Sequence, residues 1–251
     1  MPTLPTELPA FDRAAGANLA SARVLVVGLG GLGCPGATAL LQSGIGQLTL
    51  LDDDHVELDN LHRQTLFAPA DVGARKAEVA QARLRALARA QSRACRIEAK
   101  DARLTPDNAA ALLQAHDLVF DGSDNYATKY LVADWAAALG KPAVQGGVQR
   151  WQGWALLSQP GQGGCLRCLF GAAPNVGETS CGALGVVGPV VGVIAGLQAL
   201  LAVACLATTA LQSQWLSYDG QRDRLQQRPL AAVARCGCER RQGNVAWHPS
   251  P

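Results

Sequence analysis

Residues 24–33 read VLVVGLGGLG, and this stretch decides the fold. Its first four residues form a continuous apolar run, which is typical of a parallel strand buried on both faces. The glycines that follow are spaced GxGxxG, and we expect a helix from about residue 31 to residue 43. A strand that opens through such a loop into a helix presents backbone N–H groups to a phosphate. The stretch therefore predicts a nucleotide site, with a purely structural tight turn as the alternative.

Each glycine of the loop has its own expected task. Gly28 permits the tight turn, Gly30 lets the backbone approach the ligand, and Gly33 allows close packing of helix on strand. A second strand is expected at residues 47–51, and it leads directly into Asp52. A carboxylate in this position accepts hydrogen bonds from ribose hydroxyls. The pair of features favours a nucleotide without choosing between NAD, FAD and ATP.

Strand and helix patterns alternate through the first 150 residues. The expected segments are helices at 75–90, 107–115 and 130–139, strands at 95–98 and 116–121, and extended chain at 142–144. This alternation predicts a doubly wound, mostly parallel, Rossmann-like α/β sheet. Later segments are an exposed strand at 151–158, a helix at about 189–208 and a strand at 215–218. We divide the chain into an N-terminal arm (1–20), one domain (21–240) and a C-terminal tail (241–251).

Composition narrows the classes of function. The 251 residues include 22 Lys and Arg against 20 Asp and Glu, so no basic field predicts a nucleic-acid partner. The N-terminus does not resemble a secretory signal, which favours a cytoplasmic location. In a reducing compartment, eight cysteines are core residues, metal ligands or nucleophiles more often than disulfides.

One apolar stretch, residues 184–211, is long enough to span a bilayer. It contains several glycines and polar residues, and it lacks the flanking basic residues that anchor spans. We therefore expect no membrane partner. A helix beginning near Pro189 that is apolar all round is more simply buried in a core or in a dimer interface.

The choice of nucleotide depends on charges downstream of the second strand. Asn60 and Arg63 lie on one short segment, and Lys76 follows near the start of the next helix. A triphosphate needs cations beyond the helix end that already serves a pyrophosphate. Asp124, just after the strand that ends at Asp121, offers a hard oxygen ligand suited to magnesium. These residues favour ATP with magnesium, although each taken singly is more often a solvated surface charge.

Several motifs, taken in order, resemble those of one family. They are GLGGLGC (28–34), LDDD (51–54), NLHRQ (60–64), Lys76, DGSDN (121–125), CLRC (165–168) and GPVVG (188–192). Together they resemble the MoeB/ThiF/HesA family of ubiquitin-activating-enzyme-like adenylyltransferases, over about residues 20–240. The resemblance implies a homodimer that uses ATP to adenylate the C-terminal glycine of a small ubiquitin-like sulfur-carrier protein. It leaves open whether the carrier serves molybdenum-cofactor or thiamine biosynthesis.

The resemblance also implies roles for particular residues. Asp52 is implied to bind the ribose, Asp124 the magnesium, and three further side chains the phosphates: Asn60, Arg63 and Lys76. The full set implied to bind the nucleotide is Gly28, Gly30, Gly31, Gly33, Asp52, Asp54, Asn60, Arg63, Gln64, Lys76, Asp124 and Asn125. The catalytic candidates are Arg63, Lys76 and Asp124, together with Cys181, which lies where relatives carry a loop cysteine.

A structural zinc is implied by the cysteine pairs. Family members use two CxxC pairs, because four thiolates complete the tetrahedron of a structural zinc. Cys165 and Cys168 supply one pair, whereas Cys236 and Cys238 are spaced CxC. We expect this set to bind zinc as a C-terminal appendage, with a metal-free pair of loop thiols as the alternative.

The sequence departs from the family in its first residues. The arm lacks the Arg-Tyr-x-Arg-Gln type of segment, and Arg13 is the only arginine before Arg23. Either the start is truncated, another cation substitutes, or activity is impaired. Two other functions stay open: an NAD-dependent oxidoreductase, and a non-catalytic scaffold that docks a ubiquitin-like domain. None of the histidines resembles a catalytic position, and we expect His116 and His248 at the surface.

Overall fold

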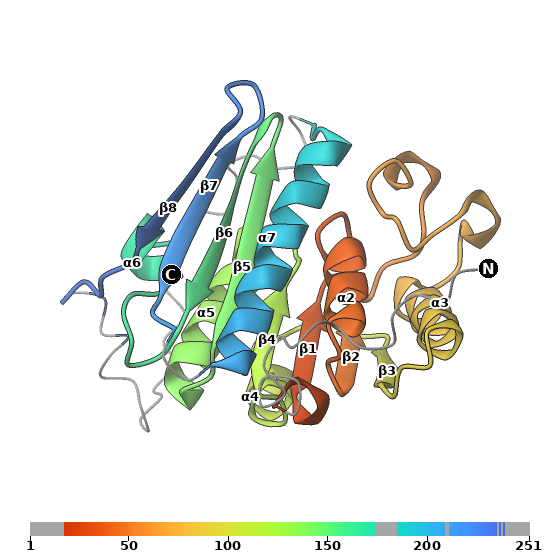
Figure 1. Ribbon diagram of the computed structural model, residues 1–251, viewed down its shortest axis with the longest axis horizontal. Helices are drawn as coiled ribbons and strands as arrows, with labels where there is room; N and C mark the ends of the chain where they lie inside the picture. The colour runs from red at the N-terminus through yellow and green to blue at the C-terminus, as the bar shows by residue number, and fades with distance from the viewer. Residues whose placement is uncertain (1–17, 174–184, 209–210, 235, 237, 239–251) are drawn as a thin grey trace.

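The computed structural model describes residues 18–173, 185–208, 211–234, 236 and 238. One eight-stranded sheet, in the order β3-β2-β1-β4-β5-β6-β7-β8, runs through the described chain (Figure 1). Strands β3 to β5 in this order are parallel, and β6, β7 and β8 extend the sheet in antiparallel fashion. The bounds are β1 Arg23–Val27, β2 Gln47–Leu51, β3 Arg96–Lys100, β4 Leu118–Asp121, β5 Ala143–Gln149, β6 Gln152–Ser158, β7 Gln214–Asp219 and β8 Arg224–Pro229.

Helices cover both faces of the parallel part of the sheet. They are α2 (Gly33–Gln42), α3 (Lys76–Ala90), α4 (Pro106–Gln114), α5 (Tyr126–Leu139), α6 (Leu166–Phe170) and α7 (Gly188–Ala207), with short 3-10 helices η1 (Leu58–Asn60) and η2 (Pro69–Asp71). Helices α2, α3 and α7 pack on one face, and α4 and α5 on the other (Figure 1). The predicted α/β fold with a Rossmann-like sheet is therefore confirmed.

Strand β1 shows why its sequence is apolar at every position. Val24 and Val26 face the core that α2 and α7 cover, whereas Leu25 and Val27 face the core that α4 and α5 cover. All four side chains are at most 4% exposed. A strand in the centre of a doubly covered sheet has no solvent face, so no polar alternation can develop.

The prediction of an exposed strand at 151–158 is wrong. Strand β6 lies between β5 and β7, and α7 packs against it, so residues 155–157 are fully buried. The burial comes from β7 and α7, which lie far from this segment in the sequence. Strand β8 was not predicted, since its sequence RLQQRP is polar and almost entirely exposed, as suits the edge of a sheet.

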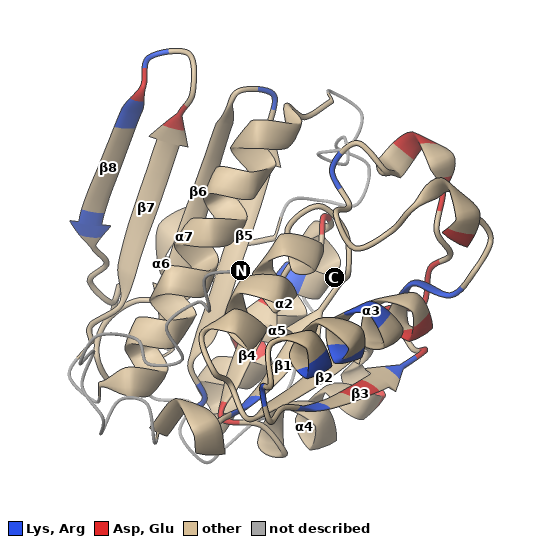
Figure 2. Ribbon diagram, turned by 45° about the vertical axis from the view of Figure 1, so that its right-hand side comes forward, with Lys and Arg blue, Asp and Glu red and all other residues tan. Residues whose placement is uncertain are grey.

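Helix α7 is the apolar stretch that raised the question of a membrane span. By length and composition it is the one helix among the described residues that could cross a membrane, with a mean hydropathy of 2.4. It lies along β5 and β6 beside α2, and Figure 2 shows it free of charged residues. Its solvent face is also apolar, because an exposed stripe of Pro189, Gly192, Val193, Gly196 and Leu200 runs along it. The expected burial in a core is confirmed for the other face.

His116 is not a surface residue, contrary to expectation. The ring is 4% exposed; its Nε2 lies 2.8 Å from Thr49 Oγ1, and its Nδ1 lies 2.6 Å from the Leu112 carbonyl. Burial lowers the pKa of His116 below its usual value, although the contact with the Leu112 carbonyl raises it. His116 therefore joins α4 to β2 and takes no part in the cavity described below. His248 lies outside the described residues.

Candidate nucleotide site and cysteine cluster

The loop between β1 and α2 needs glycine at both ends. Gly28 has a φ of +82°, and a Cβ there would lie 3.0 Å from the backbone nitrogen of Ser123. A Cβ on Gly33 would lie only 1.9 Å from the Gly28 carbonyl oxygen, so helix and strand pack as the GxGxxG spacing predicts. A Cβ on Gly30, by contrast, would meet only the Gln64 side chain, at 3.9 Å. The middle glycine therefore faces open space into which a ligand fits.

That open space is a cavity of about 330 Å³ at the carboxyl ends of β1, β2 and β4. This edge is where open α/β sheets bind their ligands. The residues predicted to bind nucleotide line it, with the exception of Gly33, whose place is in helix packing: Gly28, Gly30, Gly31, Asp52, Asp54, Asn60, Arg63, Gln64, Lys76, Asp124 and Asn125. The structure thus brings together residues from five separate segments of sequence.

Asp52 fixes the shape of the glycine loop. Its Oδ2 accepts a 2.6 Å hydrogen bond from the backbone N–H of Leu29, and its Oδ1 accepts one from Asp54. Burial raises the pKa of Asp52 above its usual value, although these two backbone donors lower it. The carboxylate at the end of β2 therefore holds the loop in place and still lines the cavity, where it can accept from a ribose.

Two cations enter the cavity from the segment after β2. Lys76 is the first residue of α3 and is only 5% exposed; its Nζ lies 3.0 Å from Asp54 Oδ2. The Arg63 side chain crosses above the glycine loop, since a Cβ on Gly31 would lie 3.2 Å from its methylenes. Both charges therefore stand beside the helix end where a phosphate is expected.

Two residues in the loop between β4 and α5, Asp124 and Asn125, have different roles. Asn125 caps α5, because its side-chain oxygen accepts a 2.9 Å hydrogen bond from the Thr128 N–H. Asp124 is exposed and lines the cavity, which suits an oxygen ligand for a hydrated magnesium ion. The structure thus provides a reason for Asn125 that is independent of nucleotide, whereas Asp124 keeps its candidate role.

A second cavity, of about 550 Å³, continues from the first. Its floor is the antiparallel part of the sheet, with Trp154 from β6 and Trp215 and Tyr218 from β7. The residues shared by both cavities are Asp124, Asn125, Lys129, Gly147 and Val148. Lys129 and this second cavity were not predicted. The only signal for Lys129 in the sequence was a lysine five residues after the candidate metal ligand Asp124, just before the helix expected at 130–139.

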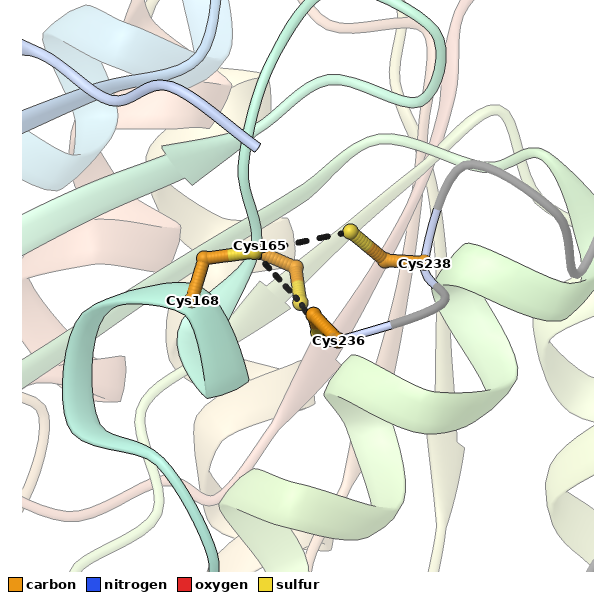
Figure 3. Close-up of side chains that lie close together, drawn as sticks. All are labelled: Cys165, Cys168, Cys236 and Cys238. Atoms are coloured by element: carbon orange, nitrogen blue, oxygen red, sulfur yellow. Dashed lines mark hydrogen bonds between the residues drawn. The ribbon is translucent and has the colours of Figure 1, made fainter. Parts of the chain in front are cut away.

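Four cysteine side chains converge at the other end of α5 (Figure 3). The Sγ atoms of Cys165 and Cys236 are 3.5 Å apart, as are those of Cys168 and Cys238, and Cys165 and Cys168 are 4.0 Å apart. All four lie within 4.8 Å of one another. Four thiolates around zinc sit about 3.8 Å apart, given Zn–S bonds of about 2.3 Å. The CxC spacing therefore completes a set of four ligands that fits a tetrahedral ion.

Among the residues that the structure describes, the cysteines outside the cluster show no sign of reactivity. Cys34 and Cys205 are buried. Burial raises the pKa of Cys34 to about 12, which disfavours the nucleophilic thiolate. Cys181, the candidate nucleophile, lies outside the described residues.

The glycine loop, the acidic residue after β2 and the cavity at the strand ends define a Rossmann-like nucleotide-binding protein. The cations and the paired cysteines are features beyond that class. The chain belongs to the ThiF family, whose model matches residues 5–240.

Curated relatives and solved structures agree with this assignment. The adenylyltransferase and sulfurtransferase MOCS3 of Anopheles gambiae is 42% identical over 207 residues, which make up 81% of this chain and 46% of that protein. The sulfur carrier protein adenylyltransferase of Thermus thermophilus is 43% identical over 195 residues, 75% of this chain and 70% of the relative. The chain thus spans about half the length of the MOCS3 relative. A crystal structure of E. coli MccB shares the fold, with a TM-score of 0.76 at 20% identity over 90% of this chain and 69% of its own.

The loop glycines yield a matched pair of substitutions. We expect Gly33→Ala to lower the free energy of unfolding by about 2–3 kcal/mol, because the new methyl group collides with a backbone oxygen. Gly30→Ala is expected to leave the melting temperature unchanged and to weaken binding of ATP with magnesium at least about tenfold. Thermal unfolding and calorimetric titration measure the two effects. An unaltered melting temperature for Gly33→Ala would contradict the packing described for the loop.

Proposed function

We propose that this chain is an ATP-dependent adenylyltransferase, which forms an acyl-adenylate on the C-terminal glycine of a ubiquitin-like sulfur-carrier protein. The observation that carries the proposal is the cavity at the glycine loop, lined by two cations and an exposed carboxylate. Membership of the ThiF family and the names of the curated relatives support it. The proposal covers sulfur carriers of both molybdenum-cofactor and thiamine biosynthesis.

The cations favour a triphosphate over a redox dinucleotide. A dinucleotide's pyrophosphate is satisfied by the N-terminus of α2, so an NAD site leaves Arg63 and Lys76 without a purpose. Lys76 is buried, with its Nζ 3.0 Å from Asp54 Oδ2 and its charge felt by the Asp52 carboxylate. These carboxylates hold the ammonium at the cavity, where it can also neutralise phosphate charge. We therefore place the β- and γ-phosphates of ATP against these two side chains.

The proposed reaction needs positioning and charge neutralisation more than covalent chemistry from the protein. A carboxylate oxygen attacks the α-phosphorus, and the bond to the β-phosphate oxygen breaks, so pyrophosphate leaves with the electron pair. Asp52 holds the loop against which the ribose lies, and Arg63 and Lys76 stabilise charge on the leaving group. Asp124 is the residue that would hold magnesium, which supplies further neutralisation of phosphate charge.

The second cavity is the proposed route for the carrier's C-terminal tail. It meets the first cavity at Asp124 and Gly147, and we call this meeting point the junction. The aromatic rings on its floor are surfaces over which an extended peptide can lie. A tail that enters along β6 and β7 reaches the nucleotide's phosphates with its terminal carboxylate. A scaffold that only docks a folded domain does not need a cavity that leads from the docking surface to the nucleotide site.

Carrier-dependent exchange of labelled pyrophosphate into ATP tests the proposed function. We expect Arg63→Ala and Asp124→Ala each to lower the exchange rate at least about 100-fold, because each removes charge stabilisation from the reacting phosphates. Arg89→Ala, which removes an exposed arginine near the end of α3, serves as the control. Normal exchange in both cavity variants would refute the proposal. A wild-type chain that binds the carrier without exchange would favour the scaffold.

We also propose that the four cysteines hold a structural zinc ion. The residues Cys165, Cys168, Cys236 and Cys238 have the separations that the ion requires, and sulfur-only ligation favours zinc. Bound zinc joins the start of α6 to the segment after β8, across about 70 residues of chain. A thiolate site of this kind suits the reducing cytoplasm that we propose as the location.

Metal analysis of the purified chain is expected to find about one zinc per chain. Cys168→Ser or removal of the ion by a chelator is expected to lower the melting temperature by roughly 4–8 °C, the shift that a loss of about 2 kcal/mol produces in a chain of this size. Cys95→Ser, outside the cluster, is the matched control. Protein that contains no zinc, with the four thiols free to react, would contradict the site.

A homodimer is the proposed assembly, and the stripe on α7 is its proposed interface. Leu200 is 61% exposed and Val193 39%, and the glycines at 192 and 196 leave room for a close neighbour. A second copy of the chain covers this stripe without placing a charge in an apolar contact.

We expect Leu200→Glu to convert a dimer into a monomer in sedimentation experiments, because it places a charge in the apolar interface. A wild-type chain that sediments as a monomer would exclude the interface.

A further inference from the structure

A buried ammonium group stands where the two cavities meet. Lys129, in the first turn of α5, is 4% exposed and lines both cavities. Its Nζ makes no hydrogen bond within the part of the chain that the structure describes, although a lysine ammonium carries three donors. A buried cation with unused donors costs stability unless a ligand satisfies it.

The structure offers two local partners for the charge of this group, and neither accepts a hydrogen bond from it. Asp121 Oδ2 lies 3.6 Å from Nζ, beyond hydrogen-bond distance, and the ring of Trp154 lies 5.7 Å away. The Asp121 carboxylate already accepts three hydrogen bonds, from the Ser123 backbone N–H, the Ser123 hydroxyl and the Gln145 amide. The hydrogen bonds of the carboxylate are therefore complete without the lysine. Lys129 forms an ion pair with Asp121 but no hydrogen bond, so its ammonium donors stay unused.

Helix electrostatics do not explain the residue either. A cation in the first turn of a helix faces the positive end of the helix dipole, which destabilises it. The Asn125 cap and the start of α5 at Tyr126 place Lys129 within that turn. An anionic ligand at the junction would accept hydrogen bonds from the ammonium and would also offset its repulsion from the helix dipole.

We propose that Lys129 is a further catalytic residue, whose ammonium binds the carboxylate of the incoming acyl group and brings it against the α-phosphate. This assignment rests on the proposed adenylyltransferase function. The carboxylate arrives along the second cavity and the triphosphate lies in the first, so Lys129, which lines both, contacts the nucleophile where the two cavities meet. Arg63 and Lys76 contact the β- and γ-phosphates in the proposed function, so neither is available to the carboxylate.

The charge balance of the step explains why a cation is needed there. Two anions must approach to bonding distance, and their repulsion in a site of low dielectric is severe. One P–O bond forms, one breaks, and pyrophosphate takes the electron pair, so no proton moves and Lys129 stays protonated throughout. Its ammonium neutralises the carboxylate during approach and afterwards contacts the acyl-phosphate oxygens.

Three variants separate this role from a structural one. Lys129→Met removes the charge at similar volume, Lys129→Arg retains a cation, and Asp121→Asn combined with Lys129→Met removes both buried charges. Lys141→Met is the matched control, because Lys141 is a partly buried lysine just past the opposite end of α5 that donates to the His116 carbonyl. Each variant is assayed for its melting temperature, its affinity for ATP with magnesium in the absence of carrier, and carrier-dependent pyrophosphate exchange with a ubiquitin-like sulfur-carrier protein.

For Lys129→Met we expect kcat/KM for the carrier to fall about 100-fold while ATP affinity stays near that of the wild type. Lys129→Arg is expected to recover part of the loss, the double variant to fold well yet stay as slow, and Lys141→Met to exchange normally. Wild-type exchange in Lys129→Met overturns the assignment, and so does recovery in the double variant, which would make Lys129 only the counter-ion of Asp121. A wild-type chain without exchange instead refutes the proposed function on which the assignment rests.

Discussion

The close approach of three backbone segments at the end of β1 is the constraint on which the rest of the structure depends. A Cβ on Gly33 would lie 1.9 Å from the Gly28 carbonyl oxygen, and one on Gly122 would lie 2.8 Å from the Gly33 nitrogen. The first turn of α2 can therefore sit directly against β1 and β4. Because of this contact, Gly30 and Gly31 line the cavity, and Asp52 can hold the loop through the Leu29 N–H.

Sequence reasoning succeeded where local chemistry and burial agree. The central strand, the glycine loop and the carboxylate after β2 follow from rules that act over a few residues, and the parallel order follows from the strand and helix alternation. It failed where neighbours distant in sequence decide burial. The ring of His116 is enclosed by β2, strand β6 is covered by α7, and the polar edge strand β8 is held by pairing with β7 alone. Lys129 was missed for the same reason, since nothing near it in the sequence reveals that its end is buried.

The antiparallel strands β6, β7 and β8 add a second cavity to the one at the ends of the parallel strands. A parallel sheet with helices on both faces has a cleft at its strand ends for a nucleotide and little more. Strands β6, β7 and β8 extend the sheet past its parallel part, and residues from all three strands line the second cavity. Two ligands of different size can thus be brought to one junction, whose shared residues come from β5 and the start of α5.

Helix α5 connects the two cavities with the cysteine cluster. It begins at Tyr126, two residues after Asp124, and carries Lys129 near its start. It ends at Leu139, and Ala137 near that end packs against Cys165 and Cys238 in the cysteine cluster. Its 14 residues make a rod of about 21 Å, at 1.5 Å per residue. One helix thus contacts both the junction of the two cavities and the cysteine cluster, so the position of the Lys129 ammonium depends on packing at an end of the helix that the ligands never reach.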